Sequence, residues 1–262
     1  MTGEQQKVAL VTGAARRIGR VIALALARHG WDVAIHYRYS EVDALATVRE
    51  IETMGRRAVA LYCDLTSEEA VSELVPRAAL KLGPLSCVVN NASVFEHDSV
   101  SDFSSGALDF HMRTNLTAPI LLARALHRMT PDGSQSVVIN LLDQKLDNLN
   151  PSFLSYTLSK AALNTATTML AQELAPKLRV AGIAPGITLV SGEQTESEFA
   201  LAHKVTPLGR SSTPDDIAAT VCFILDSPAI TGTTIVVDGG QHLIPLSQDV
   251  MFVVKMSAQN NS

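Results

Sequence analysis

The sequence of 262 residues has few cysteines, few aromatic residues and no excess of positive charge. The three cysteines, Cys63, Cys87 and Cys222, are isolated from one another and from any histidine at metal-ligand spacing. We therefore expect buried thiols in a reducing compartment, with no disulfide and no metal site. A formal net charge of -5 and an aromatic content of 5% give no basic or stacking surface, so we expect no nucleic-acid partner.

Long hydrophobic runs are also lacking. The apolar runs have the length of strands, far below the roughly 20 residues of a membrane-spanning helix. Residues 1–6 are polar and lack the basic-then-apolar order of a signal peptide. We therefore expect a cytoplasmic protein with no membrane partner.

Short β-rich runs alternate along the chain with longer helical stretches. We predict strands at residues 7–11, 32–37, 57–62, 85–89, 136–142, 178–183 and 234–237. We predict helices at residues 17–29, 41–54, 67–82, 153–174 and 214–226, the last of them capped by Ser212 or Thr213. This alternation indicates parallel strands joined by right-handed crossovers, with both faces of the sheet covered. The predicted fold class is α/β, a Rossmann-type doubly wound parallel sheet.

No linker or repeat divides residues 1–262, so we expect a single domain with a core at about residues 7–242. The polar segment 187–210 lacks a regular pattern and is expected to form a mobile lid. The tail at residues 243–262 contains the apolar run 250–254, which packs either on a neighbouring subunit or on the chain's own core. Its last residues, 257–262, are expected to be disordered.

A glycine-containing turn between the first predicted strand and helix favours a dinucleotide site. Gly13 and Gly19 let backbone N–H groups approach a pyrophosphate at the positive end of the helix, although a plain tight turn is the alternative. Arg16, Arg17 and Arg20 begin this helix. Cations there oppose the helix dipole by about 0.3–1 kcal/mol each. The cluster therefore indicates bound anions nearby, unless it is a solvated basic face.

The end of the second predicted strand favours NADPH over NADH. An NAD enzyme usually places an acidic residue here, about 20 residues after the glycines, to bind the ribose 2′-hydroxyl. Residues 36–40 read HYRYS and contain no acid. Arg38 and Ser40 instead suit a 2′-phosphate.

A tyrosine and a lysine four residues apart are the candidate catalytic pair. Tyr156 and Lys160 lie on one face of the predicted helix. A nearby ammonium favours the phenolate, so we expect a tyrosine pKa below its usual value of about 10. Tyr156 would then donate a proton at neutral pH.

These motifs stand in the order found in short-chain dehydrogenases/reductases, which the chain resembles over about residues 7–242. The residues that carry the resemblance are Thr12, Gly13, Gly19, Asp64, Leu65, Asn90, Asn91, Ala92, Asn115, Tyr156, Lys160, Pro185 and Gly186. The resemblance also implies a homotetramer, built partly on the helix that carries Tyr156.

The resemblance implies a role for each of these positions. Asp64 and Leu65 would border the adenine, Asn115 would support a proton-relay water, and Lys160 would hold the nicotinamide ribose. Taken singly, Asp64, Asn91 and Asn115 are also explained as turn or cap residues. The expected cofactor-binding set is Gly13, Arg16, Arg17, Ile18, Gly19, Tyr37, Arg38, Ser40, Asp64, Leu65, Asn91, Ala92, Ser93, Tyr156, Lys160, Pro185 and Gly186.

Three departures from the general family pattern agree with one another. Arg17 replaces the usual middle glycine of the turn, and Asp143 stands where serine is usual, thirteen residues before the tyrosine. Ser93 and Phe95 follow Asn-Asn-Ala, where glycine is common. A carboxyl group beside the tyrosine suits a substrate that is protonated on a ring nitrogen. Phe95 offers a flat face to a heterocycle, and Arg17 can hydrogen-bond a pterin as well as the cofactor phosphates.

With these departures the chain resembles the pteridine reductases, including the bacterial dihydromonapterin reductases. The shared segments are the T-G-x-x-x-R-x-G turn, the H-Y-x-x-S strand end, N-A-S-x-F and the Asp…Tyr…Lys set. The family's strand end often reads H-Y-H-R-S, whereas this chain has Arg38 followed by Tyr39. The resemblance implies NADPH-dependent reduction of a dihydropterin to a tetrahydropterin. The implied catalytic residues are Asp143, Tyr156, Lys160 and Asn115, and the implied substrate-binding residues are Arg17, Ser93, Phe95, Asp143 and Tyr156.

Other interpretations stay open from the sequence. A generic short-chain carbonyl or 3-oxoacyl thioester reductase would need neither Asp143 nor Phe95. A cofactor-binding sensor without turnover would not need the intact tyrosine and lysine. Singly, Asp143 is also explained as a solvated loop acid, Phe95 as a core aromatic and Arg17 as a cofactor ligand alone.

Overall fold

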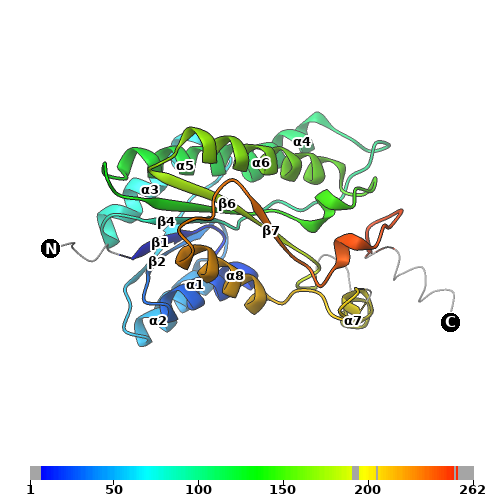
Figure 1. Ribbon diagram of the computed structural model, residues 1–262, viewed down its shortest axis with the longest axis horizontal. Coiled ribbons are helices and arrows are strands. Elements are labelled where there is room, and N and C mark those ends of the chain that lie inside the picture. The colour runs from blue at the N-terminus through cyan, green and yellow to red at the C-terminus, as the bar shows by residue number, and fades with distance from the viewer. Residues whose placement is uncertain (1–6, 191–194, 205, 251, 253–262) are drawn as a thin grey trace.

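Seven parallel strands form one sheet between two layers of helices in the computed structural model (Figure 1). The structure describes residues 7–190, 195–204, 206–250 and 252. The strand order is β3-β2-β1-β4-β5-β6-β7. Successive strands are added toward one edge of the sheet from β1 to β3 and toward the other edge from β4 to β7. The strands are β1 (Val8–Val11), β2 (Asp32–Tyr37), β3 (Ala58–Tyr62), β4 (Cys87–Asn90), β5 (Ser136–Leu141), β6 (Leu178–Pro185) and β7 (Thr234–Val237).

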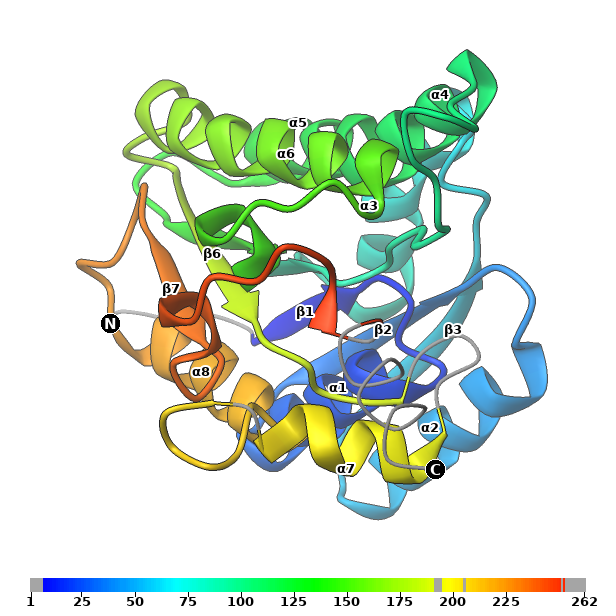
Figure 2. The same ribbon diagram turned by 90° about the vertical axis from the view of Figure 1, so that its right-hand side faces the viewer.

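The helices divide between the two faces of the sheet (Figures 1 and 2). One face carries α1 (Arg17–Arg28), α2 (Glu41–Thr53) and α8 (Pro214–Asp226). The other carries α3 (Glu68–Leu82), α4 (Ser105–Met112), α5 (Ala118–Met129) and α6 (Leu154–Glu173). The helix α7 (Glu196–Lys204) lies apart from both layers. Among the described helices, none is both long and apolar enough to cross a membrane.

Two apolar cores explain why the sheet is covered on both sides. Every residue of β1, β4 and β5 is buried, so each of these strands presents apolar side chains to both faces. On the α1 face, Ile22 and Leu26 are fully buried one helical turn apart. On the α3 face, Leu74 and Leu122 are fully buried. Each such side chain contributes about 1.5–3 kcal/mol to folding.

The predicted α/β fold class and the predicted elements are confirmed, with ends that move by a few residues at most. Thr213 is the cap of α8: its Oγ1 accepts from the Asp216 N–H at 3.3 Å, and the Asp216 carboxylate accepts from the Thr213 N–H at 2.9 Å. Ser212 has no part in this capping box.

Three helices were not predicted. The first two are α4 and α5, which a five-residue π-helical turn (Arg113–Thr117) joins. In α4 only His111 is buried, so its apolar periodicity is weak. The third is α7, which makes the expectation of an irregular segment at 187–210 wrong in part. Whether this segment moves stays a prediction.

The tail packs on the chain's own core at Val250, the first residue of the apolar run, and contact of the run with a neighbouring subunit stays a prediction. Val250 is 5% exposed and packs with Ala202, Ile187 and Leu246. The Asn148 side chain accepts from the Leu246 N–H and donates to the Ile244 carbonyl. Figure 2 shows the orange-to-red segment after β7 crossing this side of the sheet. Residues 257–262, expected to be disordered, lie outside the described residues.

Candidate active site

Two adjoining cavities lie at the carboxyl edge of the sheet, beyond the ends of the neighbouring strands β1 and β4. The groove, about 420 Å³, is lined by the turn after β1 and by the end of β2. The pocket, about 210 Å³, is lined by residues near Tyr156 and by the segments after β5 and β6. Arg17, Ile18, Asn91 and Ser93 line both cavities, so the two are continuous. Ligands of open α/β sheets bind at such a reversal of strand order.

The turn after β1 is held by a buried histidine. Gly13 has a φ of +62°, and its N–H donates to Nδ1 of His36 at 3.0 Å. Nε2 of His36 lies 3.0 Å from the Cys63 carbonyl, which can only accept. His36 is therefore a neutral imidazole that accepts at Nδ1 and donates at Nε2. Burial, which disfavours the charged ring, lowers the pKa of His36 to about 4.

Glycine is required at the helical end of the same turn. A Cβ at Gly19 would lie 2.3 Å from the Gly13 carbonyl oxygen. The Asn91 side chain also donates to the carbonyls of Thr12 and Gly13, at 2.8 and 3.3 Å. These bonds fix the turn after β1 against the residue that follows β4.

Arg17 occupies the position where the family pattern has its middle glycine. Its φ is +55°, in the left-handed region that costs a residue with a side chain of order 1–3 kcal/mol. Its guanidinium donates to the Val190 carbonyl at 2.8 Å. Arg17 thus joins the turn to the start of the segment 187–210 and faces both cavities. Such strain is common at functional sites.

The arginines of this region differ in their partners. Arg20 forms an ion pair with Glu50 of α2 and does not line the groove, whereas Arg16 and Arg17 do. Arg38 donates to Asp64 at 2.8 Å and stacks on the Tyr39 ring at 4.8 Å.

Burial would raise the pKa of Asp64, but hydrogen bonds from Thr66 and the Arg38 charge outweigh it and hold the pKa below its usual value. This carboxylate therefore stays ionised and keeps Arg38 in place at the end of β2.

The structure brings most of the expected cofactor-binding residues together. Those that line the groove are Gly13, Arg16, Arg17, Ile18, Gly19, Tyr37, Arg38, Ser40, Asn91, Ala92 and Ser93. Tyr156, Lys160, Pro185 and Gly186 line the pocket. Asp64 reaches the groove through Arg38, and Leu65 is buried and lines neither cavity.

A tyrosine–carboxylate pair lies at the centre of the pocket. The Tyr156 hydroxyl donates to Asp143 Oδ2 at 2.7 Å, and Asp143 Oδ1 accepts from the Lys145 N–H at 2.8 Å. Lys160 Nζ donates to the Leu141 carbonyl at 2.7 Å and lies 5.7 Å from the Tyr156 ring. Asp143 lies two residues after the end of β5, so the pair joins the segment after this strand to α6.

The prediction of a lowered tyrosine pKa is wrong for this arrangement. Burial and the neighbouring Asp143 carboxylate raise the pKa of Tyr156 well above its usual value. Burial also raises the pKa of Asp143 and lowers the pKa of Lys160 to about 8. The sequence argument considered the lysine and not the carboxylate, which lies closer to the hydroxyl. Both groups therefore hold their protons more tightly than they would in water.

The start of α6 is fixed by the segment after β4. The Asp98 carboxylate accepts from the Ser155 N–H at 3.0 Å and from the Ser155 hydroxyl at 2.5 Å. The preceding residue, Phe153, has a φ of +59°. Asp98 thereby caps the helix one residue before Tyr156 and sets the direction of its side chain.

Asn115 connects the same segment to α6. It is 1% exposed in the π-helical turn, and its Nδ2 donates to the Val94 carbonyl at 3.0 Å and to Ser159 Oγ at 2.9 Å. Its Oδ1 accepts from the Val94 N–H at 2.8 Å and from the Ser93 hydroxyl at 3.3 Å. These contacts give Asn115 a positioning role for the loop that carries Phe95, and the expected proton-relay role stays a prediction.

Phe95 forms one wall of the pocket. It is 39% exposed, its ring meets the Tyr156 ring edge-on at 4.7 Å, and it stacks on Phe153 at 4.3 Å. The alternative of a core aromatic therefore does not hold. The wall is flat and lies beside the tyrosine–carboxylate pair.

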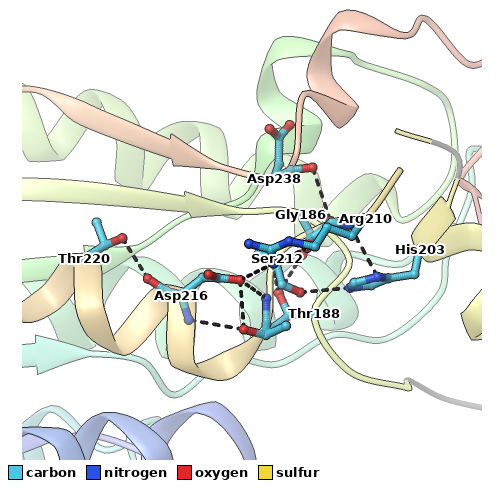
Figure 3. Close-up of polar contacts among 10 residues, drawn as sticks. Gly186, Thr188, His203, Arg210, Ser212, Asp216, Thr220 and Asp238 are labelled. Carbon is cyan, nitrogen blue, oxygen red and sulfur yellow. Dashed lines mark hydrogen bonds and ion pairs between the residues drawn. The ribbon is translucent and has the colours of Figure 1, made fainter. Parts of the chain in front are cut away.

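A network of polar contacts closes the other side of the pocket (Figure 3). Thr188 Oγ1 bonds to the Gly186 carbonyl and to Ser212 Oγ, both at 2.8 Å. The His203 Nε2 lies 3.1 Å from the Ser212 carbonyl, which ties α7 to the segment before α8. A Cβ at Gly186 would lie 2.4 Å from Ser211 Oγ. The turn after β6 therefore needs glycine and holds the start of segment 187–210 against the pocket.

Several lining residues were missed by sequence reasoning. Gln144 and Lys145 adjoin Asp143, so their position next to a predicted site residue was the available signal. Asp249 and Val250 lie in the tail, and no motif marked them. Others are Ala15, Tyr39, Leu141, Leu142, Ile187, Thr188, Leu189 and Gln241. In the described part of the chain, no group of three or more His, Cys, Asp or Glu residues could hold a metal ion.

Comparison with known proteins identifies the family. The model described as enoyl-(acyl carrier protein) reductase, a short-chain dehydrogenase/reductase model, matches residues 13–242. The chain belongs to the short-chain dehydrogenase/reductase family. A solved structure described as FolM alternative dihydrofolate reductase 1 from Brucella canis, complexed with NADP, is 39% identical. The match covers 91% of this chain and 95% of that one, with a TM-score of 0.86.

Two further relatives carry other descriptions within the same family. A short chain dehydrogenase from Burkholderia cenocepacia in complex with NADP is 33% identical, covers 90% of this chain and 97% of its own, and has a TM-score of 0.84. A 3-oxoacyl-(acyl-carrier-protein) reductase from Synechocystis sp. is 32% identical, covering 92% of this chain and 98% of its own. The general family is thus shown, and the substrate has to be argued from the pocket.

Proposed function

We propose that this short-chain dehydrogenase/reductase is an NADPH-dependent dihydropterin reductase. The observation that carries the proposal is the 2.7 Å hydrogen bond from the Tyr156 hydroxyl to Asp143 in a pocket walled by Phe95. A carboxyl group at this position can hold and relay a proton, which a serine hydroxyl does far less readily. The similarity to a protein described as an alternative dihydrofolate reductase supports the same substrate class.

The groove fits NADPH in shape and charge. Among the residues that line it are three arginines and no carboxylate, and its glycines let the backbone approach a pyrophosphate. Arg38 and Ser40 would bind the 2′-phosphate, and Pro185 and Gly186 would border the nicotinamide. NADP in two of the similar solved structures supports this assignment.

The pair Asp143–Tyr156 would supply the proton of the reaction. NADPH, when bound, provides the hydride. Tyr156 gives its proton to a ring nitrogen of the substrate, and Asp143 replaces it, because the raised pKa of Asp143 leaves a larger protonated fraction near neutral pH. Lys160, fixed by the Leu141 carbonyl, would hold the nicotinamide ribose.

Three side chains would orient the ring of the substrate. Phe95 would stack on one face of a flat heterocycle. Arg17 and Ser93, which line both cavities, would hydrogen-bond its oxygen and nitrogen atoms. Correct alignment of hydride donor and acceptor can lower a barrier by roughly 7–11 kcal/mol.

The proposal is tested by following NADPH oxidation with three substrates. Dihydrobiopterin and dihydromonapterin should be turned over, an acetoacetyl thioester should not, and NADH should be a poor replacement for NADPH. Dihydrofolate belongs in the same series, because a protein described as an alternative dihydrofolate reductase is similar to this chain. Turnover of the thioester alone would refute the proposal.

A second candidate is reduction of a 3-oxoacyl thioester. It is favoured by the similarity to a 3-oxoacyl-(acyl-carrier-protein) reductase and by the description of the matching family model. The carboxylate beside Tyr156 argues against it, because a ketone substrate gives this group no ring nitrogen to protonate.

We also propose that the protein is a homotetramer. The helix α6 exposes Leu158 at 46% and Met169 at 63%, which a subunit contact would cover. Light scattering coupled to size-exclusion chromatography would show four copies, and a monomeric mass would refute this part of the proposal.

A further inference from the structure

A buried ion pair lines the pocket and takes no part in the groove. Lys145 Nζ lies 3.0 Å from Asp249 Oδ2, and the two side chains are 4% and 16% exposed. Lys145 also donates to Asn150 Oδ1 at 2.6 Å. Both charged residues line the pocket, and neither lines the groove. Burial of two charges is expensive unless hydrogen bonds satisfy them, so a pair in this place calls for a functional explanation.

The ion pair is tied to the proton-donating pair. Lys145 lies in the short helical turn Gln144–Asp147, and its N–H donates to Asp143. Asp249 comes from the tail, where its N–H donates to Ser152 Oγ at 3.4 Å. The charge of Asp249 also contributes to the raised pKa values of Asp143 and Tyr156, which agrees with a carboxylate close to both.

The chemistry of a dihydropterin places its substituent in the same region. In a 7,8-dihydropterin the bond to be reduced joins N5 and C6, and C6 carries the substituent. Reduction adds a hydride to C6 and a proton to N5, which gives the tetrahydropterin and NADP⁺. N5 is therefore two bonds from the first atom of the substituent, and the group that protonates N5 lies about one hydrogen-bond length further. Side chains beside Asp143 and Tyr156 that line the pocket would then be within reach of that substituent.

We propose that Lys145 and Asp249 form the subsite for the C6 substituent and that the subsite selects a short hydroxylated chain. This inference rests on the proposed function. A hydroxyl group can accept from the ammonium and donate to the carboxylate, so a polyol satisfies both charges. An alkyl or aryl chain in the same place would remove water from the ion pair and return no hydrogen bond. Lys145 and Asp249 are thus specificity-determining residues.

The experiment compares substrates that differ only at C6. One carries a trihydroxypropyl chain, as in dihydromonapterin, and the other is 6-methyl-7,8-dihydropterin. The wild type should prefer the hydroxylated substrate in kcat/KM by about tenfold to a hundredfold, as expected for one or two hydrogen bonds to charged groups. Asp249→Asn should remove most of this preference, mainly through KM, while any change in kcat that acts through Asp143 and Tyr156 should be the same for both substrates. Lys145→Met should have the same selective effect.

The matched control is Asp147→Asn. Asp147 belongs to the same helical turn as Lys145, is exposed and does not line the pocket. Its substitution should therefore leave kcat/KM unchanged for both substrates. Thermal unfolding of each variant checks that the fold is kept. Calorimetric binding of the two pterins to the NADP⁺ complex should show the same loss of preference in Kd for Asp249→Asn.

The outcomes separate the two proposals. Equal losses on both substrates in Asp249→Asn, or an unchanged preference, would overturn the subsite and leave the dihydropterin reductase intact. A wild type that prefers dihydrofolate or the methyl substrate to the polyol would also overturn it. A wild type that reduces none of these pterins but reduces the acetoacetyl thioester would refute the proposed function, and the subsite with it.

Discussion

Replacement of Asp143 by asparagine is the perturbation that tests the proposed proton transfer most directly. The amide has nearly the same shape and still accepts the hydrogen bond that Tyr156 donates at 2.7 Å. It can neither be ionised nor hold a transferable proton. A hydrogen bond to a charged group contributes about 1.5–3 kcal/mol, against about 0.5–1.5 kcal/mol for a neutral one. The pKa of Tyr156 should therefore fall toward its usual value, because Asp143 is one of the two main causes that raise it.

The loss of the proton donor should lower the rate by more than the weaker hydrogen bond to Tyr156 alone would. General acid catalysis contributes typically about 10²–10⁴-fold, so kcat for a dihydropterin should fall by that factor in Asp143→Asn and in Asp143→Ala. The affinity for NADPH should stay within about twofold, because Asp143 lines the pocket and not the groove.

The dependence on pH supplies an independent check. If protonated Asp143 replaces the proton of Tyr156, kcat of the wild type declines as the pH rises through the raised pKa of Asp143. Asp143→Asn should lose this decline. Stopped-flow absorbance of NADPH over a pH series measures both the rate and its profile, with Tyr156→Phe as the control for the phenol. Turnover near that of the wild type in Asp143→Asn, or an unchanged pH profile, would refute the reasoning.

Three further predictions follow from the turn and from the cap of α8. His36 has a pKa of about 4 in the fold and about 6.5 in the unfolded chain, so the unfolded state binds the extra proton first as the pH falls. The free energy of unfolding should therefore decline by about 3 kcal/mol between about pH 6.5 and pH 4. Denaturant titrations over this pH range should show a flatter dependence of that free energy on pH for His36→Gln. An unchanged pH dependence in this variant would contradict the role of His36. Arg17→Gly should relieve the left-handed strain and raise Tm by about 2–4 °C, while it raises KM for the pterin; a lowered Tm would show that the contact with Val190 outweighs the strain. Thr213→Ala should cost about 1 kcal/mol of stability through the lost cap and leave both KM values unchanged, so an altered KM would mean that α8 is coupled to the pocket.

The sequence was sufficient for much of the groove because three short segments line it, and the constraints within each segment are local. A strand, a turn with Gly13 and Gly19, and a helix form a unit whose geometry depends on neighbours in the chain. The absence of an acid within residues 36–40 decided the expected cofactor class in the same local way, and NADP in two similar solved structures agrees with it. The strands were predictable because most of their residues are apolar, as a doubly covered sheet requires.

The electrostatics of the pocket could not be predicted in this way. The spacing of Tyr156 and Lys160 was correct, but the sign of the tyrosine pKa shift was not, because it depends on which charged group lies closer and on how much water is excluded. Asp143 is thirteen residues from Tyr156 in the chain and 2.7 Å from its hydroxyl in the fold. The helix α7 was missed for a related reason, since only one of its residues, Ala202, is buried, and it packs on the tail.

The sequence by itself determined the sheet and the turn, through periodicity and backbone freedom, and it indicated the cofactor class through the residues of a strand end. Tyr156 and Lys160 were candidates from their spacing, and Asp143 became a candidate through its place in the family pattern. Only the tertiary structure decided that Asp249, more than a hundred residues from Lys145 in the chain, completes the pocket. A contact between distant segments depends on how the whole chain folds back, and no local pattern encodes it.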